Sequence, residues 1–214
     1  MLRIRGALVA FVLAAALPGC KIIKTPTPEE KAAAAAKSAF DPATKVEAIW
    51  QSQVLPAIDK RAGELKTVLQ AIAANPDDAG VKYGNPRKQA SSPWTYAVKL
   101  SGKIVAADTA SRAGTLDVDV DGDGKADAKV QIGPAVRGTA LRDALDFLDF
   151  NEFRNQIEWA QFGKAFNEKA NSSFLAALPR DGLIGKTATV TGAFPLPPSG
   201  QLPLITPSAL TLGQ

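Results

Sequence analysis

The chain contains a single cysteine, Cys20, and no histidine. Cys20 follows an N-terminal segment in which Arg3 and Arg5 precede an uncharged apolar run from Gly6 to Pro18. A basic start followed by roughly 13 apolar residues is typical of a secretory signal, and the run is shorter than the ~20 residues of a membrane-spanning helix. We therefore expect a fold that forms outside the cytosol without a disulfide, so that its hydrophobic core alone must stabilise it.

The end of this segment, Leu17-Pro18-Gly19-Cys20, looks like a bacterial lipobox. It predicts a signal peptide over residues 1–19 and a mature chain whose first residue, Cys20, carries a diacylglycerol with fatty acyl chains such as palmitate. The alternative is an ordinary secretory signal with an incidental cysteine. Residues 20–27 are expected to form a tether. Because Lys21 rather than aspartate follows the cysteine, we expect a periplasm-facing lipoprotein of the outer rather than the inner membrane.

The composition excludes most enzyme chemistry. Without histidine the chain lacks the commonest general base and metal ligand, and lipidation of Cys20 removes the thiol nucleophile. Removing residues 1–19 takes Arg3 and Arg5 from the 25 basic residues, which leaves 23 against 21 acidic residues. This balance gives no reason to expect nucleic acid as a partner. We expect that the protein is not an enzyme. A metal-dependent hydrolase that uses aspartates remains as a minor alternative.

Residues 28–92 have the pattern of a helical region. Thr27-Pro28-Glu29-Glu30 forms a capping box for a helix to about Phe40, and Asp41-Pro42 starts another helix. Apolar residues then recur every three or four positions from Val46 to Ile72, with a break expected near Leu55 because of Pro56. We expect this apolar stripe to pack on the core of the protein itself. A groove for a partner is the alternative.

From Pro93 the apolar period changes to that of strands. Five strands are predicted, at 95–106 with a bulge at Gly102, 115–120, 128–132, 187–194 and 202–212, and helices are predicted at 139–148 and 151–178. Three strands, helices and two strands are the order of an OB-fold barrel. We therefore predict an α+β fold in which N-terminal helices pack on a five-stranded OB-like barrel domain, residues 93–214, with helices between strands three and four. A generic α+β sheet is the alternative.

Carboxylates alternate in the hairpin between the second and third predicted strands. Asp119, Asp121 and Asp123 occupy the side-chain positions of a calcium loop, Lys125 the carbonyl position, and Asp127 a direct or water-mediated position. The twelfth position holds Val130 rather than the glutamate of an EF-hand. The pattern predicts a hairpin that binds Ca²⁺. The alternative is a polar hairpin tip, because Asp-Gly is a common turn signal.

A second polar group surrounds the start of the predicted helices. Arg137, Arg142, Asp143, Asn155 and Gln156 bring together forked donors that suit a carboxylate, a phosphate or sugar hydroxyls. We predict ligand or partner binding by this group. The same residues could instead satisfy loop carbonyls and neighbouring carboxylates.

Several segments resemble a known family. They are IGPAVRGTALRDALDF, FNEFRNQIEWAQFGKAFN, GKTATVTGAF and VEAIWQSQVLPAI, with YG at 83–84. Together they resemble an uncharacterised bacterial family of predicted periplasmic lipoproteins, a domain of unknown function whose genes often lie beside those of sugar ABC transporters. The resemblance implies a lipoprotein with an accessory role in transport, and it supplies no catalytic or binding residues.

Two functions follow as expectations. The first is a lipid-anchored, non-catalytic binding protein associated with solute (sugar) ABC uptake, whose partner is the transporter or its solute-binding protein. The second is a structural envelope lipoprotein that oligomerises through its helices. The predicted strands contain few of the aromatic residues that single-stranded nucleic-acid sites use, which disfavours that use of an OB-fold.

Overall fold

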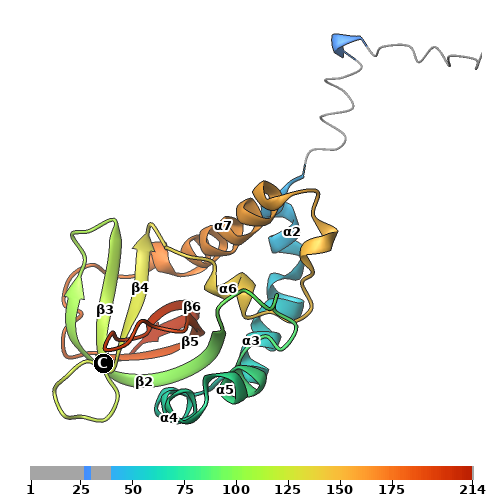
Figure 1. Cartoon of the computed structure of the whole chain (residues 1–214). Coiled ribbons are helices and arrows are strands. Elements are labelled where there is room, and N and C mark those ends of the chain that lie inside the picture. Colours follow the sequence, from blue (N-terminus) through green and yellow to red (C-terminus); the bar gives the residue numbers. More distant parts are fainter. Residues whose placement is uncertain (1–26, 30–39, 214) are drawn as a thin grey trace, which may run out of the picture. The chain divides into compact units, whose positions relative to one another are not determined.

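The computed structural model describes residues 27–29 and 40–213 (Figure 1). Phe40–Gln214 form one compact unit, in which helices pack with a β-barrel. The predicted signal peptide, Cys20 and the helix expected over 30–39 lie outside the described residues. Pro28 and Glu29 are helical, as the capping box predicts.

The helical segment begins at a side-chain cap. The Asp41 carboxylate accepts hydrogen bonds of 3.1 Å from the backbone N–H groups of Ala43 and Thr44, and Pro42 is the first residue of α2 (Pro42–Ile49). A π-helical segment, Trp50–Val54, separates α2 from α3 (Leu55–Arg61). The kink or break expected near Leu55 thus takes the form of a π-helical segment within a chain that stays helical on both sides. Its cause is Pro56, which has no N–H to donate and whose ring crowds the preceding turn.

After α3 the chain forms the two-residue strand β1 (Gly63–Glu64), then α4 (Leu65–Ala74) and α5 (Pro76–Tyr83). The Asn75-Pro76 segment ends α4 and also starts α5, a helix that was not predicted from the sequence. The Asn75 side-chain oxygen accepts hydrogen bonds from the N–H groups of Asp77 (2.9 Å) and Asp78 (3.3 Å), and this cap is what begins the helix.

The barrel consists of five strands: β2 (Thr95–Asp108), β3 (Ala113–Asp119), β4 (Ala128–Pro134), β5 (Thr187–Pro195) and β6 (Leu204–Leu212). The order β2-β3-β4-β6-β5 is closed by the pairing of β5 with β2. All pairings in the barrel are antiparallel except β4 with β6, which is parallel. This is the predicted OB-like barrel, and the α+β fold class is confirmed.

The predicted bulge lies elsewhere. Gly102 pairs in regular register with Ala188, and the irregularity in β2 falls between Ile104 and Ala106. Gly102 has a different role, because a Cβ atom there would lie 2.2 Å from the carbonyl oxygen of Asp119 on the next strand. The glycine thus permits a close backbone approach rather than a change of register.

The helices between β4 and β5 are shorter than predicted. They are α6 (Ala140–Asp143), a 3₁₀ turn at Phe150–Glu152, α7 (Gln156–Ser173) and a 3₁₀ turn at Leu175–Ala177. Thr139 does not cap α6. Its hydroxyl instead donates to the carboxylate of Asp143 at 2.5 Å. The first helix ends after one turn, and an irregular segment precedes α7.

Two apolar clusters form the core. The barrel interior holds one cluster, which includes Tyr96, Val98 and Leu100 of β2. The second lies between the helices and the outer face of the barrel, where Ala97 of β2 packs with residues of α2, α6 and α7. The first part of the apolar stripe belongs to this second cluster and is at most 1% exposed at these positions: Val46, Trp50, Val54 and Ile58. Its last part, Leu65 and Val68 of α4, belongs to the first cluster.

Gly102→Ala should destabilise the fold by roughly 1–3 kcal/mol, because the new methyl group meets the fixed backbone of Asp119. Urea unfolding of the purified protein measures this change. Gly213→Ala is the matched control, since a Cβ there meets only ordinary contacts of 3.6 Å or more. Equal stability of the two variants would contradict the close approach.

Candidate functional site

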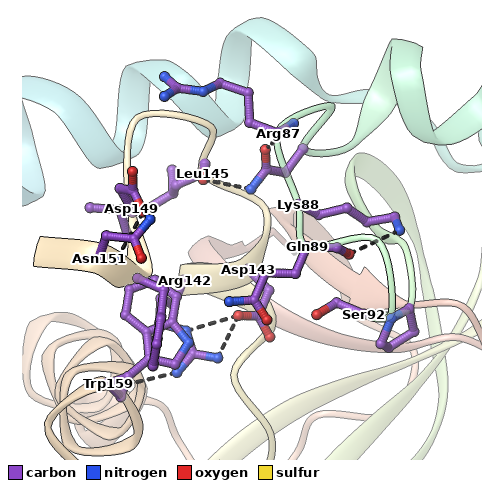
Figure 2. A pocket seen from close by; sticks show the side chains of 14 residues that line it. Arg87, Lys88, Gln89, Ser92, Arg142, Asp143, Leu145, Asp149, Asn151 and Trp159 are labelled. Carbon is purple, nitrogen blue, oxygen red and sulfur yellow. Dashed lines mark hydrogen bonds and ion pairs between the residues drawn. The ribbon is translucent and has the colours of Figure 1, made fainter. Parts of the chain in front are cut away.

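A polar cleft of about 360 Å³ lies among the helices rather than in the barrel (Figure 2). Three parts of the chain line it: the loop 85–93 between α5 and β2, the segment 142–151 that includes the end of α6, and Trp159 on α7. The volume lies at the lower end of the range for small-molecule sites.

Arg142 forms the floor of the cleft. Its Nε and Nη2 donate to Asp143 Oδ1 at 2.8 and 2.6 Å, and Nη1 donates to the carbonyl oxygen of Trp159 at 2.8 Å. The guanidinium carbon also lies 4.2 Å from the centre of the Trp159 ring. With its side chain only 9% exposed, Arg142 is neutralised by Asp143 and fixed in one orientation.

The loop 85–93 is held at both ends. At its start, Asn85 donates to the Leu145 carbonyl oxygen at 2.9 Å and accepts from the Arg87 N–H at 2.8 Å. Just beyond its end, Trp94 donates through Nε1 to Asp77 at 2.5 Å, and the ammonium of Lys88 lies 4.6 Å from the Trp94 ring. These contacts keep the loop in place as one wall.

The opposite wall is the 3₁₀ turn that follows Asp149. One oxygen of its carboxylate, Oδ1, accepts from both the N–H and the Nδ2 of Asn151 at 2.9 Å. Phe150 meets the Trp159 ring edge-on at 5.9 Å, and Phe153 packs against Trp159 with ring centres 4.9 Å apart. Aromatic packing therefore joins this wall to the floor.

Only two of the five predicted ligand-binding residues line the cleft, Arg142 and Asp143. Asn155 instead caps α7 by accepting from the Glu158 N–H, and Gln156 is exposed on the first turn of that helix. The backbone N–H and carbonyl of Arg137 are both bonded to the side chain of Gln131. For Asn155 and for the backbone of Arg137, the alternative interpretation therefore applies: they make hydrogen bonds within the protein itself.

Five further residues line the cleft that were not predicted from the sequence: Asn85, Lys88, Gln89 and Ser92 of the loop, and Trp159. The only local signal was the turn-rich composition between Asn85-Pro86 and Pro93, which predicts a loop but not what it faces.

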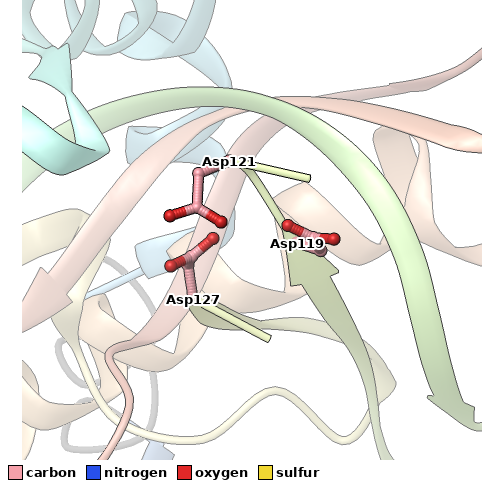
Figure 3. Close-up of side chains that lie close together, drawn as sticks. All are labelled: Asp119, Asp121 and Asp127. Atoms are coloured by element: carbon pink, nitrogen blue, oxygen red, sulfur yellow. The ribbon is translucent and has the colours of Figure 1, made fainter. Parts of the chain in front are cut away.

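The acidic hairpin forms a second site (Figure 3). Oxygen atoms of Asp119, Asp121 and Asp127 all lie within 4.8 Å of one another, so three of the predicted calcium ligands come together. Asp123 is not among them, and its Oδ1 accepts from the N–H of Lys125 at 2.8 Å. The Lys125 side chain is 86% exposed and lies 4.0 Å from Asp123.

Backbone N–H groups already surround Asp119. Its two oxygens accept from Gly122 (2.7 Å) and Gly124 (2.8 Å), both of which have the positive φ angles that glycine favours. The hydrogen bond from Gly124 is the main cause that holds the pKa of the Asp119 carboxyl below its usual 3.8. Burial opposes it, and bonds from Gly122, Asp121 and Asp123 add to it.

Helix α4 lies beside the hairpin. Lys66 places its ammonium 3.4 Å from Asp121 Oδ2, and both residues line a hollow of about 160 Å³ whose floor is formed by Leu65, Leu69 and Val120. An ion held by Asp121 would therefore compete with the ammonium of Lys66.

The comparisons with known proteins agree with the fold. The model of a family described as predicted periplasmic lipoprotein (DUF2291) matches residues 10–211. A crystal structure of an OB-fold protein from Thermotoga maritima is similar with a TM-score of 0.63 and 17% identity, over 82% of this chain and 99% of that chain. The comparison with curated proteins found no match. Among the described residues, none of the helices has the length and apolar character needed to span a bilayer.

Asp119→Asn should lower the midpoint of thermal unfolding at pH 7, because an amide NH₂ would face one of the two glycine N–H groups. A lowered pKa stabilises the fold above the unfolded value of about 4, and this stabilisation is lost as the pH falls through the folded pKa. The difference between wild type and variant should therefore narrow below about pH 4.

Asp123→Asn is the control for this measurement, made in the presence of a chelator, because only one oxygen of Asp123 accepts a backbone bond and asparagine keeps it. A constant difference between wild type and Asp119→Asn from pH 7 to pH 3 would argue against the role assigned to the Asp119 charge.

Proposed function

Because the chain belongs to this family of predicted periplasmic lipoproteins, we propose that it is anchored through Cys20 and acts by binding a small polar solute. In this proposal it is a non-catalytic accessory of an ABC uptake system for sugars. Its membrane is the outer one, since Lys21 follows the anchor cysteine. The transporter association is supported by the family resemblance.

The observation that carries the binding role is the pre-formed cleft. Its floor is rigid because Arg142 is bonded to Asp143 and to the Trp159 backbone, and its loop wall is held through Asn85. A binding site whose side chains are already fixed loses little conformational entropy when a ligand enters. This arrangement favours recognition of a solute.

The roles of the cleft carboxylates also support binding rather than catalysis. Asp143 accepts from Arg142 and Thr139, and Asp149 accepts from Asn151, so each holds structure in place. A general base needs a carboxylate oxygen within reach of the proton of the ligand. Both oxygens of Asp143 and one oxygen of Asp149 already accept hydrogen bonds from the protein itself.

Oligomerisation through the N-terminal helices is the second candidate. The face that would mediate it, formed by Val46, Trp50, Val54 and Ile58, is buried in the core of the protein itself. This burial favours the binding role. A stable oligomer in sedimentation that is insensitive to solutes would favour the structural role.

Affinity purification of the full lipidated protein from envelope extracts tests the proposal. We expect subunits of an ABC importer or its solute-binding protein to be enriched, and mass spectrometry to find the diacylglycerol on Cys20. Cys20→Ser should remove the lipid and release the protein from the outer-membrane fraction. Failure to enrich any transporter component, or an unmodified N-terminus in the cytosol, would contradict it.

Calcium binding by the hairpin stays a prediction, and the grouping of Asp119, Asp121 and Asp127 favours it. Calorimetry should give a dissociation constant of roughly 10⁻⁴–10⁻³ M, as in extracellular calcium modules. Asp121→Asn should weaken binding, whereas Asp108→Asn, which alters an exposed acid on the β2–β3 hairpin, should not. No heat and no change in melting temperature at millimolar Ca²⁺ would exclude the site.

A further inference from the structure

We infer that the ligand of the cleft is an uncharged, polyhydroxylated molecule of monosaccharide size, which Gln89, Ser92 and Asn151 recognise. This inference rests on the proposed binding role and specifies the chemistry of its ligand. It follows from which polar groups of the cleft are already used and which are left over.

The basic groups of the cleft and Asp143 are engaged or directed elsewhere, whereas Asp149 uses only one of its two carboxylate oxygens. Arg142 and Asp143 neutralise each other at the floor. The Lys88 ammonium lies over Trp94 and within 3.4 Å of two carbonyl oxygens of its own loop. Figure 2 shows the side chain of Arg87 extending away from Arg142 and Asp143. An anionic ligand would lose its hydration without gaining an unpaired counter-charge at the floor, which is costly.

Apart from Oδ2 of Asp149, an acceptor that a ligand hydroxyl can also meet, the groups left over are neutral. The Gln89 amide and the Ser92 hydroxyl make no hydrogen bond within the part of the chain that the structure describes, and Asn151 uses its Nδ2 but not its Oδ1. Gln89 and Ser92 come from the loop wall, and Asn151 comes from the opposite wall (Figure 2). Amides and hydroxyls both donate and accept hydrogen bonds, and ligand hydroxyls match them in both respects.

The volume of the cleft and its remaining lining residues also suit an uncharged, polyhydroxylated ligand. About 360 Å³ suits a single sugar ring or a cyclic polyol rather than a polymer. Leu145, Leu148 and Phe150 add apolar contacts among the polar walls, which suit the C–H groups of such a molecule. A ligand with hydroxyls around its edge and C–H groups on its faces therefore meets both kinds of lining.

The test is calorimetry on the full lipidated protein in detergent micelles that contain no sugar. The neutral probes are glucose, galactose, ribose, xylose and myo-inositol, and the anionic probes are glucuronate, gluconate and glucose 6-phosphate. We expect saturable binding of at least one neutral probe with a dissociation constant of roughly 1 mM or tighter. The anionic probes should bind at least about tenfold more weakly.

Gln89→Ala, Ser92→Ala and Asn151→Ala should each weaken that binding roughly three- to tenfold, the effect of losing one hydrogen bond to an uncharged group. The side chains of Gln89 and Ser92 make no hydrogen bond among the described residues. The melting temperatures of the two alanine variants should therefore stay at the wild-type value. Gln201→Ala, which removes an exposed amide from the β5–β6 connection, is the control and should bind as wild type does.

Three results would overturn the inference: no binding of any neutral probe, equal or tighter binding of an anionic probe, or wild-type affinity in all three cleft variants. The proposed transporter association fails separately. Purification without transporter subunits, together with probe binding that depends on Gln89, would reject the association and keep the inference.

Discussion

The pairing of Ala97 with Ala193 is the contact on which the rest of the architecture depends. The two residues face each other across β2 and β5 and are fully buried on the outside of the barrel. Their small side chains allow α3 and α6 to pack directly against these strands. The neighbours Tyr96 and Val98 point into the barrel, so β2 is buried on both faces and joins two cores. The helices that carry the cleft are thereby attached to the strands that close the barrel.

This arrangement places the cleft beside the barrel rather than on its strands. The floor comes from α6 and α7, and one wall comes from the loop that leads into β2. Phe153 connects the floor to the helical core, since its ring packs against Trp159 at the floor and against Phe162 in that core. The barrel thus serves as a rigid support, and the irregular segments around the helices supply the polar groups. Loops positioned by a rigid scaffold often carry binding residues.

The features that the sequence predicted correctly are those whose cause lies within a few residues along the chain. Alternating apolar residues located the strands, and Pro56 located the helix break, because both act within a few residues. Gly102 was misassigned because the backbone that approaches it belongs to Asp119, on another strand.

The candidate site was predictable only in part for the same reason. Arg142 and Asp143 are adjacent in sequence, so their pairing could be anticipated as a polar group. The loop residues Gln89 and Ser92 face them only because β2 and α5 bring the loop across, and no local pattern encodes that placement.

Closure of the barrel also determines how other molecules can dock. A strand whose backbone N–H and C=O groups are unpaired is a template for an added strand from a partner. Here β5 closes against β2, and among the described residues the short β1 covers part of β2 as well. Along β2 a partner strand therefore finds few unpaired groups. The strands β4 and β6 pair only through Lys129–Leu204 and Val130–Ile205, so a protein that docks by strand addition would have to use the edges beyond this short pairing.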